Sequence, residues 1–298
     1  MKSIDLLSTI HKRYRATKEA IMNSWEHQSR QMAVPDTDIP NRKNVLLITI
    51  DCLRNDHLSR AGYDHQTTPF LDSLTGTPAI SAAPWTFSSV PSILTGEYPH
   101  THGAVYPTDD SRNQDLSDPP HNIEEGVVTL GEILESVDYE THFTTAIETA
   151  AIPVRGRFGS LTINHNAPAA ELLTETLRWW NTREIPKFAY IHLGDLHEPL
   201  LEPDNPEFGP VPDIDGVDKW RFTEGVTPDD KFTAYRDARI QLYDSILREL
   251  DRAIERFLDH LDERQDTVVV ITSDHGEEFW EYHELEREHF DDPRGIYG

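Results

Sequence analysis

Two apolar segments far apart in the sequence each end in side chains that bind metal ions in proteins. Val45–Ile50 (VLLITI) is followed directly by Asp51, and Thr267–Ile271 (TVVVI) is followed after a Thr-Ser pair by Asp274 and His275. Open α/β sheets bind ligands at the carboxyl ends of their strands, so we expect these side chains to converge. Their oxygen and nitrogen donors suit Zn²⁺ or Mn²⁺, and also Mg²⁺ or Ca²⁺ if water completes the coordination. One such strand end alone would favour a turn residue or a helix cap, whereas two favour a metal site.

A hydroxyl-rich segment, Pro84–Gly96, supplies a candidate nucleophile. Thr86 precedes a short predicted helix, whose free N–H groups and positive dipole end could hold an anionic ester. A threonine bound to a metal loses its proton more easily and could attack phosphorus or sulfur. On this segment alone, a simple helix cap at Thr86 is the stronger interpretation. Ser88 and Ser89 are competing caps, and Pro91 fits best if the helix begins at one of them, because proline belongs in the first turn.

Helices and strands alternate around these residues. Apolar patterns predict strands at 45–50, 140–145, 188–193 and 267–271, and helices at 124–137, 168–181 and 232–261. This alternation predicts an α/β fold with a mostly parallel central sheet and helices on both faces. A polar, proline-rich stretch at 198–230 is expected to be a long surface excursion.

The N-terminal residues are expected to form a separate helix and linker. Apolar residues recur at helical spacing between Ile4 and Trp25, which predicts an amphipathic helix with one buried stripe formed by Leu7, Ile10, Tyr14, Ile21 and Trp25. Two prolines within 33–42 indicate a linker. We therefore expect an N-terminal helix and linker at 1–43 and a catalytic α/β domain at 44–298.

The amino-acid composition limits the possible binding partners and the cellular compartment of the protein. The chain has 27 Lys and Arg against 53 Asp and Glu, a net charge of −26, which argues against nucleic acid and anionic lipid as partners. The acidity is spread along the chain, which favours adaptation to high salt and a halophilic source. Cys52 is the only cysteine, so no intrachain disulfide is expected. The sequence shows no apolar run of membrane-spanning length and no signal peptide, and we therefore expect a cytoplasmic protein. The charge leaves the oligomeric state open.

Several motifs occur in an order that resembles a known family. Between Asn44 and Gly103 lie NVLLITIDCLRNDHL, GY, TTPFLDSL, APWTFSSVPSILTG and YPHTHG, and further on come FAYIHLGDLHEPL and TVVVITSDHGEEF. Together they cover Asn44 to Phe279 and resemble the sulfatase family of the alkaline-phosphatase superfamily. The resemblance implies that a divalent metal contacts the Thr86 oxygen and is ligated by Asp51, Asp274 and His275.

The same resemblance implies roles for two further histidines. His197 would approach the substrate or the leaving-group oxygen, and His102 would lie near the nucleophile. Without the resemblance, each is more often an ordinary, partly exposed histidine.

The sequence departs from sulfatases proper at the nucleophile. Those enzymes carry Cys or Ser in a Cys-x-Pro-Ser-Arg motif that is oxidised to formylglycine, whereas here Thr86 and Val90 occupy the Cys and Arg positions. No formylglycine is therefore expected, and Cys52 is interpreted as a small buried residue at a strand end. A Thr nucleophile resembles the phosphodiesterase, phosphonate-hydrolase and phosphotransferase branches, which favours phosphoryl over sulfate chemistry. The substrate would be a small or polymer-linked anionic ester.

The end of the sequence is the second departure. The family usually continues beyond the Asp-His-Gly motif with a further histidine and a C-terminal subdomain, whereas this sequence stops at Gly298. His283 and His289 are the remaining candidates, and a solvated helix face is the preferred interpretation of both. We expect that the C-terminal part is missing. Two alternatives follow: a non-catalytic, truncated metal-binding protein, or a divergent sulfatase that acts without formylglycine.

Overall fold

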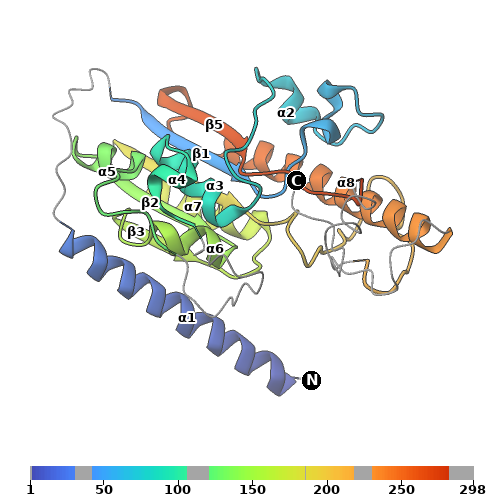
Figure 1. Cartoon of the computed structure of the whole chain (residues 1–298), viewed down its shortest axis with the longest axis horizontal. Coiled ribbons are helices and arrows are strands. Elements are labelled where there is room, and N and C mark those ends of the chain that lie inside the picture. Colours follow the sequence, from blue (N-terminus) through green and yellow to red (C-terminus); the bar gives the residue numbers. More distant parts are fainter. Residues whose placement is uncertain (1, 31–41, 106–120, 185, 218–229, 282–298) are drawn as a thin grey trace.

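The fold is built on one sheet of five parallel strands. The computed structural model describes residues 2–30, 42–105, 121–184, 186–217 and 230–281. The strands lie in the order β3-β2-β4-β1-β5, and every pairing between them is parallel (Figure 1). Their bounds are β1 Asn44–Ile50, β2 Glu140–Thr145, β3 Ser160–Ile163, β4 Lys187–Leu193 and β5 Thr267–Ser273. The predicted α/β fold with a parallel sheet is confirmed.

The register of the sheet brings the ends of β1, β4 and β5 to one edge. Ile50 at the end of β1 lies opposite Leu193 of β4 and Ser273 of β5. The residues that follow, Asp51 and Asp274, therefore leave the sheet side by side. β1 is the neighbour of both strands and is buried along most of its length, as its continuous apolar sequence predicts.

Helices pack around the sheet, with α8 behind it and α3 in front of it in the view of Figure 1. The main helices are α1 Lys2–Ser29, α3 Thr86–Thr95, α5 Leu130–Glu135, α7 Ala169–Asn181 and α8 Asp230–Asp259, with short helices α2 Pro69–Ser73, α4 Pro99–His102 and α6 Glu148–Ala151. The predicted helices at 168–181 and 232–261 match α7 and α8 to within two residues at each end. In the described part of the chain, no helix is both long and apolar enough to cross a membrane.

Two local predictions need correction. The helix predicted at 124–137 is only the six residues of α5, because Thr129 begins it with a capping box. The Thr129 side chain accepts a hydrogen bond from the Glu132 N–H, and the Glu132 carboxylate accepts one from the Thr129 N–H. β3 was not predicted, because four residues with one polar face give too short a pattern.

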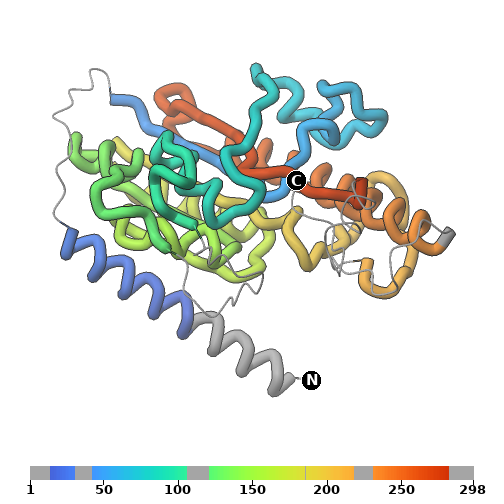
Figure 2. Tube along the Cα trace, viewed as in Figure 1, coloured from blue at the N-terminus to red at the C-terminus, as the bar shows by residue number. Residues whose placement is uncertain are grey.

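The N-terminal helix exists, but the prediction of its buried face is wrong. Tyr14, Ile21 and Trp25 are 67%, 64% and 71% exposed, whereas Glu19 and Asn23 on the opposite face are buried. The Asn23 side chain donates to the Phe158 carbonyl (3.0 Å) and accepts from the Gly156 N–H (2.8 Å). Polar contacts to the loop before β3 thus decide the orientation of α1, which lies along the side of the domain (Figure 2). The side chains of residues 1–13, including the predicted Leu7 and Ile10, lie outside the described residues.

Candidate functional site

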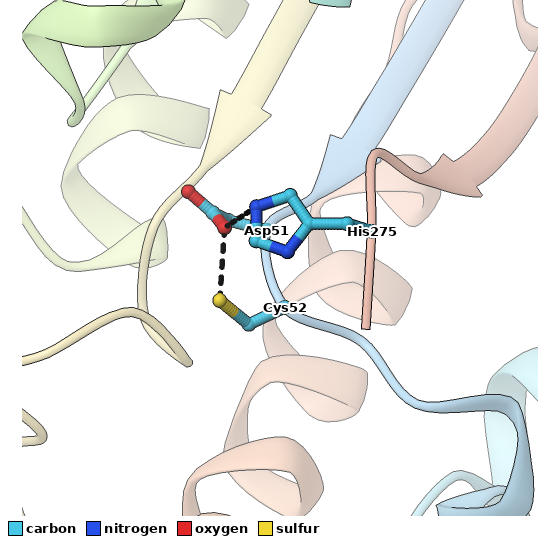
Figure 3. A group of neighbouring side chains, drawn as sticks. All are labelled: Asp51, Cys52 and His275. Atoms are coloured by element: carbon cyan, nitrogen blue, oxygen red, sulfur yellow. Dashed lines mark hydrogen bonds and ion pairs between the residues drawn. The ribbon is translucent and has the colours of Figure 1, made fainter. Parts of the chain in front are cut away.

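The ends of β1 and β5 bring three of the predicted metal ligands together. His275 Nε2 lies 3.4 Å from Asp51 Oδ1 and 3.7 Å from Asp274 Oδ2 (Figure 3 draws His275 beside Asp51). Both aspartates have no exposed surface, and His275 is buried as well. Local contacts fix the orientation of these groups: the His275 N–H donates to Asp274 Oδ1 (2.9 Å), and its ring Nδ1 donates to the Gly276 carbonyl (2.7 Å), which leaves Nε2 facing the carboxylates.

A fourth group at this centre, His192, was missed by sequence reasoning. It is the penultimate residue of β4 and is fully buried. Its Nε2 lies 3.2 Å from Asp274 Oδ2 and 3.9 Å from Asp51 Oδ2, so it stands between the two carboxylates. The available signal was an imidazole within the otherwise apolar segment FAYIHL. A polar residue in a strand buried on both faces requires a partner.

Thr86 lies at the start of α3, so the expectation of a helix beginning at Ser88 or Ser89 is wrong. Both serines are already used elsewhere: Ser88 Oγ donates to the Ala104 carbonyl (2.8 Å) and Ser89 Oγ to the Asp274 carbonyl (2.5 Å). Pro91 consequently lies inside the helix, which spans Thr86–Thr95. The Ser89 bond ties α3 directly to the end of β5 and sets the nucleophile segment against the ligand residues.

The Thr86 hydroxyl points into the group of predicted ligands. Its Oγ1 lies 3.2 Å from His275 Nε2 and 3.4 Å from Asp51 Oδ2. The residue is buried and occupies the first position of α3, where backbone N–H groups have no partner within the helix. A hydroxyl, two carboxylates and two imidazoles therefore lie next to one another, at the end of a helix that favours negative charge.

The electrostatics of the centre call for a cation. Burial acts to raise the pKa of Asp274, but His275 and His192 outweigh it and hold that pKa below its ordinary value. Burial likewise acts to lower the pKa of His275, and Asp274 and Asp51 raise it overall. Within the described ranges, no lysine or arginine is within ion-pair distance of Asp51 or Asp274, so these two buried carboxylates face imidazoles, the Thr86 hydroxyl and the Cys52 thiol but no lysine or arginine.

The spacing of these atoms fits a divalent metal ion. Ligand atoms bound tetrahedrally at about 2.0–2.2 Å lie about 3.3–3.6 Å from one another. His275 Nε2 has Thr86 Oγ1, Asp51 Oδ1 and Asp274 Oδ2 at 3.2, 3.4 and 3.7 Å. The described part of the chain holds two groups of at least three possible ligands within 4.8 Å: Asp51 with Cys52 and His275, and Asp51 with His192 and Asp274. The residues present therefore suit a metal.

The two other histidines singled out by the sequence are placed differently. His102 is fully buried beneath α3, where its Nδ1 accepts from the Ala104 N–H (3.0 Å) and its Nε2 contacts Ser92 Oγ (2.9 Å) and the Ser88 carbonyl (3.2 Å). Burial lowers its pKa, which suits a neutral ring that supports the helix. His197 is half-buried in the loop after β4, with its Nδ1 bonded to the Glu198 carbonyl (2.7 Å). Catalytic roles for both stay predictions.

The remaining candidates, His283 and His289, lie outside the described residues.

A large cavity of about 1370 Å³ reaches the site at Asp274 and His275, with Ile93, Val269 and Ile271 in its apolar wall. Neither Thr86 nor Asp51 lines it, so it does not mark where an ester would meet the nucleophile.

A second buried acid lies nearby, on α8. Asp244 has no exposed surface and receives three hydrogen bonds, from His57 Nδ1 (2.7 Å), the Tyr63 hydroxyl (2.7 Å) and His65 Nδ1 (2.9 Å). We refer to these four residues as the Asp244 centre. It fastens the segment that follows Asp51 to α8 and belongs to neither of the possible metal groups found among the described residues.

The fold is shared with solved structures of other proteins. The zinc complex of the C-terminal periplasmic domain of EptC from Escherichia coli is similar with a TM-score of 0.57 and 18% identity, over 88% of this chain and 72% of that one. The phosphonate monoester hydrolase of Agrobacterium radiobacter is similar with a TM-score of 0.55 and 18% identity, over 79% and 63% of the two chains. At these identities the likeness is one of fold.

The sequence comparison gives the family itself. The model of the Sulfatase family matches residues 43–298, and the chain belongs to that family. The low-salt glycan biosynthesis sulfotransferase Agl7 of Haloferax volcanii is 28% identical over 236 residues, which are 79% of this chain and 47% of that protein. The chain thus spans about half the length of this relative. The resemblance drawn from the motifs is confirmed, and the general class is that of sulfatase-like hydrolases and transferases.

Proposed function

We propose that this protein transfers a phosphoryl or sulfuryl group from an anionic ester, with Thr86 as the nucleophile and Asp51, Asp274 and His275 as ligands of a divalent metal ion. The observation that carries the proposal is the position of Thr86 Oγ1, 3.2 Å from His275 Nε2 and 3.4 Å from Asp51 Oδ2, at the start of α3.

The chain's own residues account for the main steps. The N-terminal end of α3, with its positive dipole end, would bind the ester oxygens, and Thr86 Oγ1 would attack in line, forming a bond to phosphorus or sulfur as the ester oxygen leaves. The proton of Thr86 would pass towards the adjacent Asp51 carboxylate or to solvent, and His197 would protonate the leaving oxygen. A bound divalent ion would supply the positive charge that offsets the charge developing on the transferred group. Water or an acceptor alcohol would then release the group from Thr86.

Phosphoryl chemistry is the leading form of the proposal. Val90 stands where sulfatases proper have an arginine, and threonine cannot become formylglycine. Sulfuryl transfer is the second candidate, and the name of the relative Agl7, a sulfotransferase, favours it. A non-catalytic metal-binding role is the remaining alternative.

The test is turnover by the purified chain of a bis-aryl phosphate, an aryl phosphate and an aryl sulfate. Each ester is supplied with Zn²⁺, Mn²⁺, Mg²⁺ or Ca²⁺ at molar KCl, since the net charge is −26. We expect metal-dependent release of the aryl alcohol that Thr86→Ala lowers by at least about 10³-fold. Thr86→Ser is the matched control, because it keeps a hydroxyl at the same point and should retain part of the rate.

The outcomes separate the alternatives. The preferred ester distinguishes phosphoryl from sulfuryl transfer. A Thr86→Ala variant as active as the parent would refute the nucleophile, and absence of turnover with metal bound would favour the non-catalytic role.

A further inference from the structure

Cys52, the only cysteine of the chain, lies directly beside the candidate metal ligands. It follows Asp51 in the sequence and is 2% exposed. Its Sγ lies 3.0 Å from Asp51 Oδ1, the same oxygen that lies 3.4 Å from His275 Nε2. Figure 3 shows the sulfur and the imidazole approaching this carboxylate from different sides, and the three ligand atoms lie within 4.8 Å of one another.

A buried cysteine is more often a packing residue, and the sequence alone favours that interpretation. The position of Cys52 at the edge of the core is compatible with it, but the direction of its side chain is not what packing alone requires. Cys52 belongs to the hydrophobic core cluster, yet its thiol also donates to a buried carboxylate. A thiol, an imidazole and a carboxylate around one point are also the donor types found together in zinc sites.

The backbone at Cys52 is held in the conformation that produces this geometry. Its φ of 59° lies in the left-handed region, which costs energy for a residue with a side chain. The Tyr243 hydroxyl of α8 donates to the Cys52 carbonyl (2.8 Å) and accepts from the Arg54 N–H (2.9 Å). The turn after β1 is thus fixed on both sides of the thiol, and Sγ is directed at Asp51.

We propose that Cys52 is a thiolate ligand of the same divalent ion as Asp51 and His275, and that it makes the centre selective for zinc over magnesium and calcium. This inference rests on the proposed function, which leaves the metal open. On binding, the S–H bond of Cys52 breaks, a sulfur–metal bond forms and the proton leaves to the buffer. Thiolate favours Zn²⁺ and Co²⁺, whereas Mg²⁺ and Ca²⁺ prefer oxygen ligands.

The test is a titration of the metal-free full chain with Co²⁺, followed by absorption spectroscopy. We expect visible d–d bands from bound Co²⁺ together with a near-ultraviolet sulfur-to-cobalt charge-transfer band. Because the chain has a single cysteine, a thiolate band can arise only from Cys52. The matched variant is Cys52→Ser, whose hydroxyl can still donate to Asp51 Oδ1. It should keep the visible bands and lose the near-ultraviolet band.

A competition titration with a chromophoric chelator gives the selectivity. Cys52→Ser should weaken Zn²⁺ binding on the order of 10- to 100-fold and leave Mg²⁺ binding almost unchanged. Circular dichroism of both metal-free proteins confirms that the variant is folded.

The two proposals fail in different ways. Visible bands without a near-ultraviolet band in the parent chain would show that metal binds and that Cys52 is not a ligand, which overturns this inference alone. Equal Zn²⁺ affinity in the parent and Cys52→Ser would do the same. No Co²⁺ or Zn²⁺ binding by the parent chain would overturn this inference, and the metal-dependent function would be overturned as well only if Mn²⁺, Mg²⁺ and Ca²⁺ also failed to bind.

Discussion

Two buried acidic centres lie close together in this protein, and they are balanced in opposite ways. In the Asp244 centre, one carboxylate receives hydrogen bonds from two imidazoles and a phenol at 2.7–2.9 Å. At the candidate active site, Asp51 and Asp274 are both fully buried and share two imidazoles and one threonine hydroxyl at 3.2–3.9 Å. Each also has one closer donor: the Cys52 thiol lies 3.0 Å from Asp51 Oδ1, and the His275 N–H donates to Asp274 Oδ1 at 2.9 Å. The first centre has three donors for one carboxylate, whereas the second places two carboxylates side by side, and the side-chain contacts that they share are longer.

The difference shows how a metal site can be told apart from a structural polar cluster. Both contain buried Asp and His, so residue type and burial do not separate them. The ratio of carboxylates to hydrogen-bond donors does separate the two centres, because buried like charges without a compensating cation are costly. The comparison therefore predicts opposite responses to the loss of one acid.

The largest expected effect is that of Asp274→Asn on activity. Removal of this ligand should lower turnover on the order of 10²–10³-fold or more, because charge stabilisation at the transferred group is lost. The metal-free variant should lose little stability, since the relief of one of two buried like charges offsets the lost partner of His275 and His192. Stopped assays with the preferred ester and urea unfolding in EDTA measure the two quantities. A large destabilisation of the metal-free variant would break the comparison, since it would make Asp274 a structural acid.

Asp244→Asn should show the reverse pattern. Three donors lose their charged acceptor, so we expect the free energy of unfolding to fall by about 3–5 kcal/mol. The loss should be the same with Zn²⁺ and with EDTA, because the Asp244 centre holds no ion in this interpretation. Urea unfolding under both conditions checks it. A loss that appears only with metal present would assign the Asp244 centre to the metal site.

A smaller effect concerns acid sensitivity outside both centres. Burial, aided by Arg183, lowers the pKa of His142 on β2 from 6.5 to about 4. The unfolded chain therefore takes up a proton at higher pH than the folded one. Stability should be complete above about pH 6.5 and fall as the pH drops towards 4, by roughly 3 kcal/mol from this group.

The control for His142 is the variant His142→Phe. It keeps an aromatic ring against Trp179, whose ring centroid lies 4.8 Å from that of His142. It has no group that titrates in this range. The difference in unfolding free energy between pH 7.5 and pH 4 should be smaller in the variant by roughly 3 kcal/mol. An equal difference in both proteins would mean that the acid sensitivity resides in the acidic centres instead.

The sequence predicted the parts of the fold that local patterns encode. β1, β4 and β5 were recognised from apolar runs, and β2 was expected as a short strand. Asp51, Asp274 and His275 were recognised because they follow two of those runs. His192 was missed because it lies inside a strand, where no turn or motif marks it. Its role depends on the contact of β4 with β1, between segments more than 130 residues apart.

The errors share this cause. The orientation of α1 is decided by hydrogen bonds from Asn23 to the loop at Gly156 and Phe158, so its apolar stripe gave the wrong face. The start of α3 is decided by Ser88 and Ser89, whose hydroxyls bond to distant carbonyls instead of capping the helix. Long-range polar contacts are not visible in local periodicity.

The pairing of β1 with β5 also has a consequence for how the protein is made. Ser273 bonds to the Ile50 carbonyl across 223 residues of chain. At ribosomal rates of about 5–20 residues per second, β1 leaves the ribosome roughly 10 to 45 seconds before β5 can join it. During that interval Asp51 has neither Asp274 nor His275 beside it. The proposed metal ion could therefore be bound only late in biogenesis. The nascent strand β1, apolar along most of its length, must be shielded from aggregation until its second neighbour has been synthesised.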